Sequence, residues 1–455
     1  MVAVNTSFFS DMLQSIADRS RAFLRERREP ARDRSDGIIE LCEALLSGRG
    51  EASGVALANE ILADYAELTV GPRIAFFEEL ARTFGHDRTR IDAAIAAWNQ
   101  LPSAATAAQL HRASEPRRLE LFRRLNLAPG GTAALVRMRE QLLDAMDHRE
   151  DLAVVDNDFI HLFSSWFNRG FLVLRRIDWS TPASILEKII RYEAVHEIRD
   201  WDDLRRRIDL PDRRCYACFH PALVDDPLIF VEVALTRAIP GAIAPILSDK
   251  REVVEPQRAT TAVFYSITNC QRGLAGVTFG HFLIKQVVEE VRRELARISN
   301  FVTLSPAPNF AAWLKRERAN ETSIALDEND RLALAALEQP NWWREQASIA
   351  TIREPLMRAA AWYYLRARNS RGLPADSVAR FHLGNGARLE RLNWPADISD
   401  RALAQSYGLM VNYLYDLDYI EQNHEAYAQQ HAVVAASTVS RLVRSPSREV
   451  VPVSG

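Results

Sequence analysis

The spacing of apolar residues changes about one third of the way along this 455-residue chain. Up to about residue 150, apolar residues recur every three or four positions, the period of an amphipathic helix, as in segments 38–45, 74–84 and 117–125. Beyond residue 156, short runs rich in β-branched and aromatic residues take over. Because one core rarely grows to this length, we expect a helical domain over residues 1–155 and an α/β domain over residues 156–455.

The second domain is expected to combine strands and helices in a mixed sheet. Its predicted strands cover residues 171–174, 228–236, 262–268 and 301–304, and a helix over 281–297 separates the last two. A strand, a helix and a strand in this order indicate a parallel crossover. Residues 354–365 and 400–416 are predicted to be helical. The fold class is therefore an all-α bundle followed by an α/β domain with a mixed sheet.

Composition excludes several classes of partner. The net charge of −3 gives no general basic field that would attract nucleic acid. No stretch approaches the roughly 18 to 20 apolar residues that a membrane span needs, and the first 23 residues do not follow the pattern of a secretory signal. Four cysteines in so long a chain do not make a disulfide framework. We expect a cytoplasmic protein with neither nucleic-acid nor membrane partners.

The familiar hydrolase and metal motifs are missing from the sequence. There is no Gly-x-Ser-x-Gly elbow, and neither His196-Glu197 nor His424-Glu425 has the second histidine that a zincin helix requires. Cys215 and Cys218 have CxxC spacing without a second pair, so core thiols are favoured over a zinc site. No metal is expected.

A glycine-rich segment, QRGLAGVTFG over residues 271–280, lies between a predicted strand and a predicted helix. Glycines let backbone N–H groups approach an anion closely, and a helix N-terminus adds partial positive charge. This arrangement suits a pyrophosphate, although the segment is neither a Walker A loop nor a dinucleotide fingerprint. An ordinary glycine-rich turn is an equally good interpretation of the segment taken alone.

Three other polar positions are ambiguous by themselves. His382 lies in the segment FHLGNG, where a structural or surface histidine is the favoured interpretation. Ser305 ends the FVTL strand and could cap the backbone or face a substrate. Residues 407–419 carry four tyrosines and Asn412 on a predicted helix, a spacing more typical of a core than of a site.

In combination and in order, these segments resemble the malonyl-CoA decarboxylase family. The resemblance runs over roughly 300 residues, through IIRYEAVHEIRDW, RRCYACFHP, FYSIT, GLAGVTFGHFLIKQVV, TLSPAPNFAAWL, PLMRAAAWYY, FHLGNGARLERLNWPAD and YGLMVNYLY. It implies a helical oligomerisation domain before a catalytic domain with the fold of the large N-acetyltransferase superfamily (the GNAT fold). The helical first domain resembles the family only loosely.

The resemblance also implies roles for particular residues. The family's catalytic serine, in Leu-Ser-Pro, falls on Ser305, its catalytic histidine, in Phe-His-Leu, on His382, and a pocket tyrosine on Tyr415. Asn412 belongs to the same Asn-Tyr-x-Tyr motif and is expected to contact the substrate. Thr278 departs from the pattern, since some members have Glu there. The CoA-binding residues implied are Ala275, Gly276, Val277, Thr278, Phe279, Gly280 and His281.

The chemistry of the implied reaction suits these residue types. Loss of CO2 from malonyl-CoA leaves an enolate, which needs hydrogen-bond donors and then a proton on carbon. Histidine, with an unperturbed pKa near 6.5, can supply that proton. No cofactor is implied beyond the CoA of malonyl-CoA and acetyl-CoA, and a homodimer or homotetramer is expected. The alternatives are a CoA-dependent N-acyltransferase and a non-catalytic acyl-CoA-binding regulator.

Overall fold

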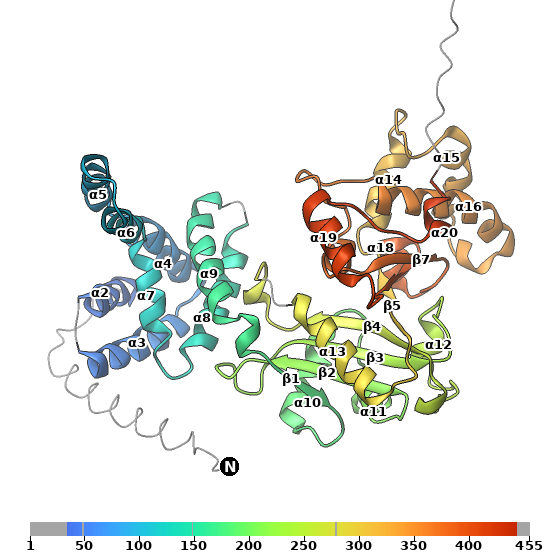
Figure 1. Cartoon of the computed structure of the whole chain (residues 1–455), viewed down its shortest axis with the longest axis horizontal. Coiled ribbons are helices and arrows are strands. Elements are labelled where there is room, and N and C mark those ends of the chain that lie inside the picture. Colours follow the sequence, from blue (N-terminus) through green and yellow to red (C-terminus); the bar gives the residue numbers. More distant parts are fainter. Residues whose placement is uncertain (1–33, 48–49, 148, 278–279, 444–455) are drawn as a thin grey trace, which may run out of the picture. The chain divides into compact units, whose positions relative to one another are not determined.

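The computed structural model describes residues 34–47, 50–147, 149–277 and 280–443 (Figure 1). The chain divides into two compact units. The first contains residues up to Val173 together with segments 219–226 and 271–279, and the second contains the remainder. The boundary expected at 155/156 lies inside helix α9, so the helical unit extends further along the chain than the apolar spacing indicated.

The first unit is helical, as predicted. Aromatic residues fill its core, where the rings of Phe122 and Phe159 stack at 4.2 Å. Two arginines are buried with acidic partners: Arg118 with Asp158, and Arg139 with Asp156 at 2.8 Å. Its helices are α2 (Arg34–Leu46), α3 (Glu51–Ala66), α4 (Val70–Arg82), α5 (Arg88–Gln100), α6 (Ala104–Ala113), α7 (Arg117–Leu125), α8 (Gly131–Ala145), η1 (Glu150–Leu152), α9 (Ala153–Trp166), η2 (Arg169–Phe171) and, from the later insertion, η4 (Arg272–Leu274).

The second unit is built on one mixed sheet, as the sequence led us to expect, but with eight strands among the described residues where four were predicted. The strand order is β1-β2-β3-β4-β5-β8-β6, with β7 also paired to β8. The strands are β1 (Val173–Ile177), β2 (Arg213–Phe219), β3 (Pro227–Thr236), β4 (Thr261–Asn269), β5 (Asn300–Thr303), β6 (Ser305–Pro306), β7 (Arg388–Asn393) and β8 (Met410–Leu414).

Strands β4 and β5 form the predicted parallel crossover, and helix α13 (Gly280–Glu294) connects them. Strand β3 pairs antiparallel with β4, and β8 pairs antiparallel with β5, β6 and β7. The remaining helices of this unit are α10 (Ala183–Tyr192), α11 (Trp201–Ile208), α12 (Ala244–Leu247), η3 (Pro256–Arg258), α14 (Phe310–Ala319), α15 (Glu328–Leu334), η5 (Ala335–Glu338), η6 (Trp342–Arg344), α16 (Gln346–Leu365), α17 (Ser377–Gly384), α18 (Asp400–Ser406), α19 (Ile420–Gln430) and α20 (Ser437–Ser440).

The helix predicted over residues 400–416 is wrong in its second half. Helix α18 ends at Ser406, because Tyr407 and Gly408 both adopt positive φ angles, 53° and 81°. The chain then enters β8, all five residues of which are buried. Val411 and Tyr413 suit a strand buried between neighbours, and tertiary pairing overrides the helical spacing of the apolar residues. The tyrosine-rich segment is therefore largely a central strand.

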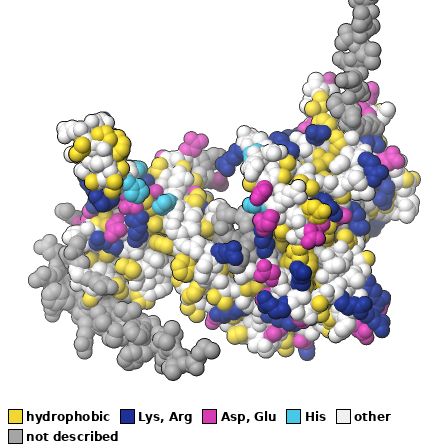
Figure 2. Space-filling view, viewed as in Figure 1, with side chains coloured by type: hydrophobic (Ala, Val, Ile, Leu, Met, Phe, Trp, Pro, Cys, Tyr) yellow, Lys and Arg dark blue, Asp and Glu magenta, His cyan; other side chains and the backbone are white. Residues whose placement is uncertain are grey.

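Charges of both signs are interleaved on the surface. On the face drawn in Figure 2, Lys and Arg side chains alternate with Asp and Glu over both units. This agrees with the small net charge of −3. None of the described helices is both long enough and apolar enough to cross a membrane.

Glycine is required directly after helix α17. Gly386 has φ +82°, and a Cβ placed there would lie 2.1 Å from the backbone oxygen of Ile420, at the start of α19. A side chain would therefore separate two helix ends that meet in the core. Gly372 has a similar φ of +74°, but a Cβ added to it would have no atom within 4 Å.

We expect Gly386→Ala to destabilise the chain much more than Gly372→Ala. Both variants incur the strain of a positive φ, about 1 to 3 kcal/mol, and only Gly386→Ala adds a backbone clash. Chemical unfolding of both variants measures the difference. Equal losses of stability would show that the contact with Ile420 relaxes at little cost.

Candidate active site

Three segments distant in sequence bring Ser305, His382 and Tyr415 together. Ser305 begins β6, His382 lies in the last turn of α17, and Tyr415 follows β8. The Oγ of Ser305 lies 3.1 Å from Nε2 of His382, and Nδ1 of His382 lies 2.8 Å from the hydroxyl of Tyr415. The imidazole is therefore hydrogen-bonded on both sides, and the three residues that the resemblance singled out form one continuous chain.

Helix α17 places His382 through its two ends. The buried carboxylate of Asp376 caps the helix by accepting from Ala379 N–H at 2.8 Å. At the other end, Asn385 N–H donates to the carbonyls of Phe381 and His382, both at 3.1 Å. The motif FHLGNG is thus the end of a short helix, with Gly386 supplying the left-handed turn that stops it.

His382 is a core residue in this structure, with only 3% of its surface exposed. Its ring stacks on Tyr413 with 4.6 Å between centroids and 27° between planes. Burial lowers the pKa of His382 to about 3, because a charged imidazolium loses its hydration there. The imidazole is consequently neutral at pH 7, whereas the sequence alone suggested only the unperturbed pKa of an exposed histidine.

The serine is positioned by the strand that precedes it. Thr303 and Ser305 project from the same face, and the Ser305 hydroxyl donates to Oγ1 of Thr303 at 2.9 Å. Oγ1 of Thr303 also accepts from the backbone N–H of Tyr413 at 3.1 Å. Sequence reasoning missed Thr303; its i−2 position relative to Ser305 in the same extended segment was the signal that could have identified it.

Strands β4 and β5 separate at this place. Their pairing ends at Phe264 and Thr303, although β4 continues to Asn269. Tyr265 is an extra residue in β4, since Glu232 and Val233 of β3 pair with Ser266 and Phe264. Bulges of this kind redirect a strand and often lie beside active sites. Ser305 therefore follows directly on the point where two parallel strands diverge.

Asn412 has a different environment from the one expected of a substrate ligand. Its Nδ2 donates to the carbonyls of Thr303 at 2.7 Å and Pro240 at 3.3 Å. Its Oδ1 accepts from Asn393 at 2.8 Å and Arg391 at 3.1 Å. A side-chain amide has two donors and about two acceptor sites, so all are used inside the fold. These hydrogen bonds give Asn412 a structural role, and its contact with substrate stays a prediction.

The glycine-rich segment belongs to the helical unit. Arg139 of α8 is 1% exposed, and its Nη1 donates to the carbonyls of Gly273 at 2.8 Å and Ala275 at 2.7 Å. A Cβ on Gly273 would lie 2.0 Å from the carbonyl oxygen of Val136. This glycine is therefore needed for packing against α8, a function that the anion-loop interpretation did not foresee.

Only part of the expected CoA loop is described. Ala275 and Gly276 form an exposed turn, Gly276 with φ +80°, and Val277 is buried. Thr278 and Phe279 lie outside the described residues, as do the surroundings of Gly280 and the side chain of His281. Gly280 opens helix α13. Arg139 from α8 holds the beginning of this loop, and the binding of CoA by the loop stays a prediction.

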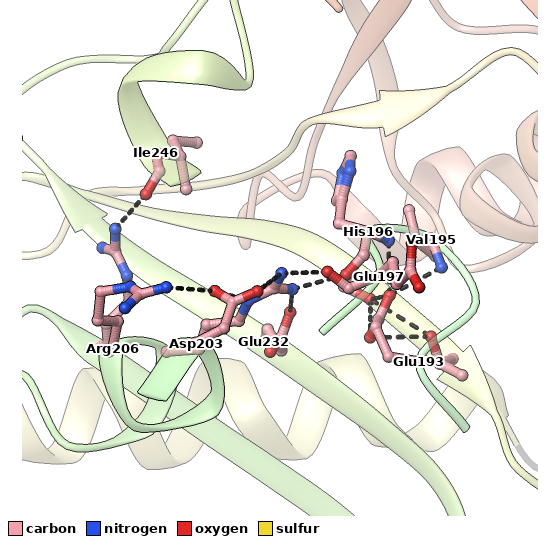
Figure 3. A network of polar contacts seen from close by, with 12 residues as sticks. Glu193, Val195, His196, Glu197, Asp203, Arg206, Glu232 and Ile246 are labelled. Atoms are coloured by element: carbon pink, nitrogen blue, oxygen red, sulfur yellow. Dashed lines mark hydrogen bonds and ion pairs between the residues drawn. The ribbon is translucent and has the colours of Figure 1, made fainter. Parts of the chain in front are cut away.

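A second polar network lies in the part of the sheet that contains the β4 bulge (Figure 3). Glu193 accepts from the N–H groups of Val195 at 2.7 Å and His196 at 2.8 Å, and from the Ser266 hydroxyl at 2.8 and 2.9 Å. The segment that follows α10 is thereby fixed to β4. His196 and Glu197 contribute backbone here, which agrees with the absence of a zincin motif.

Arg207 of α11 completes this network. It donates to the carbonyls of His196 and Glu197, both at 2.7 Å, and pairs with Asp203 and Glu232 at 3.3 Å. Glu232 is fully buried, and burial raises the pKa of its carboxyl group to about 8. Through these buried contacts, Arg207 joins the carbonyl groups of His196 and Glu197 to Glu232 of strand β3.

Among the described residues, neither the cysteines nor the other possible metal ligands form a second functional site. Cys215 and Cys218 are buried free thiols in β2, which confirms their interpretation as core residues. Burial raises the pKa of Cys218 to about 12, so it stays a protonated thiol. Within the described ranges, no three His, Cys, Asp or Glu side chains are placed to hold a metal ion.

Comparisons with known proteins agree with this arrangement. The profile of the malonyl-CoA decarboxylase N-terminal domain matches residues 84–167, and that of the C-terminal domain matches residues 170–452. The mitochondrial malonyl-CoA decarboxylase of Rattus norvegicus is 34% identical over 407 residues, which are 82% of this chain and 82% of the relative. That of Anser anser anser is 37% identical over 355 residues, 72% of this chain and 69% of the relative.

Solved structures match over nearly the whole chain. The crystal structure of malonyl-CoA decarboxylase from Rhodopseudomonas palustris is 57% identical, with a TM-score of 0.87, and the match covers 90% of this chain and 99% of that one. The corresponding structure from Agrobacterium vitis is 54% identical, also with a TM-score of 0.87, over 90% and 100%. The chain therefore belongs to the malonyl-CoA decarboxylase family.

Proposed function

We propose that this chain converts malonyl-CoA to acetyl-CoA and CO2 at the chain of Ser305, His382 and Tyr415. The observation that carries the proposal is the imidazole of His382, held on both sides by hydroxyl groups in a buried site. The family membership of the chain supports the substrate. The reaction needs no acceptor other than a proton.

The reaction balances with one proton per turnover. The bond between the carboxylate carbon and the methylene carbon breaks, and its electron pair enters the thioester as an enolate. The methylene carbon then takes a proton from His382, which is replaced from solvent. Hydroxyl groups such as that of Ser305 can hold the malonyl carboxylate before it leaves, and donors near the thioester oxygen stabilise the enolate.

The buried setting of His382 couples its charge to the chemistry. With only protein groups around it, its pKa is about 3, so it is neutral. An anionic malonyl carboxylate bound beside it favours the imidazolium form, because an opposite charge offsets the cost of desolvation. When CO2 departs, the negative charge moves from the carboxylate to the enolate, and the imidazolium can pass its proton to the methylene carbon. Proton delivery is thereby favoured after the carbon–carbon bond has broken.

The glycine-rich segment is proposed to bind the CoA part of the substrate. Its exposed turn at Ala275 and Gly276 leads to the N-terminus of α13, where backbone N–H groups favour phosphate. Arg139 holds the carbonyls of Gly273 and Ala275, which restricts the loop before it reaches Gly276. Neither a metal nor an organic cofactor other than CoA is part of the proposal.

For assembly, we propose a homodimer or homotetramer in which the helical unit takes part. The curated relatives are named as mitochondrial proteins, and a cytoplasmic location for this chain is our proposal from its sequence.

The decisive assay gives the protein malonyl-CoA alone. Acetyl-CoA and CO2 should form without an acceptor, which neither an N-acyltransferase nor a regulator would achieve.

His382→Asn should lower kcat by roughly 10² to 10⁴, the usual range for a positioned acid–base group. Ser305→Ala should also be impaired, and the double variant should lose less than the sum of the two effects.

The matched control for this assay is the exposed His431 of the same unit, at the end of α19. His431→Asn should retain normal turnover, and its positive φ of 53° is one that Asn accepts. A folded His382→Asn enzyme with near-normal kcat would require another proton donor, with Tyr415 the first candidate.

Stability should depend on pH through His382. Because its folded pKa, about 3, is below its unfolded value near 6.5, the unfolded chain binds more protons between these values. The contribution to stability is complete above about pH 6.5 and is lost as the pH falls towards 3. We expect the free energy of unfolding to fall less steeply from about pH 6.5 to pH 4 in His382→Asn than in the unaltered chain. Parallel slopes would contradict a neutral, buried imidazole.

Substitution of Gly276 tests the CoA loop. Gly276→Val should weaken binding of both malonyl-CoA and free CoA by about tenfold or more, a loss of about 1.4 kcal/mol or more. Gly130→Val is the control, since Gly130 has a similar φ of +72° in the same unit and nothing within 4 Å. Isothermal titration calorimetry measures the affinity of both variants for malonyl-CoA and for free CoA. Unchanged CoA affinity in a folded Gly276→Val protein would make the segment an ordinary turn.

A further inference from the structure

Thr303 lies at one end of the buried hydrogen-bonded chain of the site. It lies at the end of β5 and is fully buried. Its Oγ1 accepts from the backbone N–H of Tyr413 at 3.1 Å and from the hydroxyl of Ser305 at 2.9 Å. The first contact is part of the junction between β5 and β8, so the acceptor is held in place by the sheet itself.

The direction of the Ser305 bond fixes the next one. A serine hydroxyl has a single proton, and here Ser305 donates it to Thr303. The Oγ of Ser305 must therefore act as an acceptor towards Nε2 of His382, 3.1 Å away. Nε2 then carries the proton of the neutral imidazole, and Nδ1 is left as an acceptor.

Tyr415 satisfies the other end of the ring. Its hydroxyl lies 2.8 Å from Nδ1 and can donate its proton there. In the opposite arrangement Nδ1–H would donate to Tyr415, and Ser305 would have to donate to Nε2 instead of Thr303. The direction of the Ser305–Thr303 bond therefore favours the Nε2-protonated tautomer.

We propose that Thr303 is a positioning residue that fixes the direction of the chain Tyr415→His382→Ser305→Thr303 and holds His382 in its Nε2-protonated form. Because burial keeps the imidazole neutral, only one of its two nitrogens carries a proton, and the ring therefore has a defined tautomer. Thr303 acts through Ser305 and needs no contact with the substrate.

The direction of these hydrogen bonds also indicates which type of reaction the site favours. This step rests on the proposed function. In hydrolases with a Ser–His pair, the serine donates to the imidazole, which then removes its proton and makes it a nucleophile. Here the serine proton points to Thr303 and the imidazole N–H points to the serine. In the protein without substrate, Ser305 is therefore the acceptor for Nε2–H, and its own proton is directed away from the imidazole. This suits protonation of an enolate better than formation of an acyl-enzyme.

The test compares three variants of the full chain: Thr303→Val, which is similar in shape but lacks the acceptor, Thr303→Ser, which restores it, and the control Thr261→Val. Thr261 is likewise a fully buried threonine, on the neighbouring strand β4, and its hydroxyl contacts the side chains of Thr260 and Asn300. Nitrogen-15 NMR of histidine-labelled protein at neutral pH reports which imidazole nitrogen is protonated. The spectrum of His382→Asn identifies the His382 signals by difference.

The expected result is an Nε2-protonated ring in the unaltered chain, in Thr303→Ser and in Thr261→Val. Thr303→Val should give a mixture of tautomers or the Nδ1-protonated form. With malonyl-CoA, Thr303→Val should lower kcat about tenfold with little change in KM, and Thr303→Ser should recover most of the loss. A purely structural role would not move the tautomer signal.

Two outcomes would overturn the proposal. One is an Nδ1-protonated or mixed ring in the unaltered chain, which decides the matter even if Thr303→Val does not fold. The other is a folded Thr303→Val protein with an unchanged tautomer. Failure of the proposed function is separate: a protein that gives no acetyl-CoA but keeps the expected tautomer pattern would refute decarboxylation and retain the role of Thr303.

Discussion

The position of strand β8 inside the sheet is the constraint on which the site depends. β8 pairs with β5, β6 and β7 at once, and so brings Tyr413 and Tyr415 beside Thr303 and Ser305. Asn412 strengthens the same junction, since its amide bridges Thr303 of β5, Asn393 of β7 and the carbonyl of Pro240. A buried amide whose donors and acceptors are all hydrogen-bonded can fix the positions of the strands that it joins. The Asn412 amide therefore keeps these strands from sliding past one another.

The chemistry of the site follows from this burial. Hydroxyl and imidazole groups that water cannot reach must satisfy one another, and here they do so in a single chain. The same burial lowers the pKa of His382 and keeps the ring neutral.

The helical unit holds the glycine-rich segment in place, which the sequence did not indicate. Arg139 reaches from α8 to two carbonyls of the glycine-rich segment, and Gly273 is confined by the backbone of the same helix. The beginning of the glycine-rich segment is thus held by helix α8 of its own unit. Stability of the bundle and the conformation of the loop are linked through these contacts, since loss of the Arg139 guanidinium would leave both carbonyls without that donor.

The sequence by itself determined the helical first part, the strands β3, β4 and β5 and the crossover helix α13, and through the resemblance to the family its motifs singled out Ser305, His382 and Tyr415. These follow from local periodicity and from ordered motifs, both of which are properties of contiguous residues. Only the tertiary structure decided that residues 410–414 form a central strand, because pairing with β5 and β7 outweighs the helical spacing there. It alone identified Thr303 and Arg139 and gave Asn412 its structural role. Those roles depend on contacts between segments up to about 140 positions apart, and no local pattern records which buried donor will meet which acceptor.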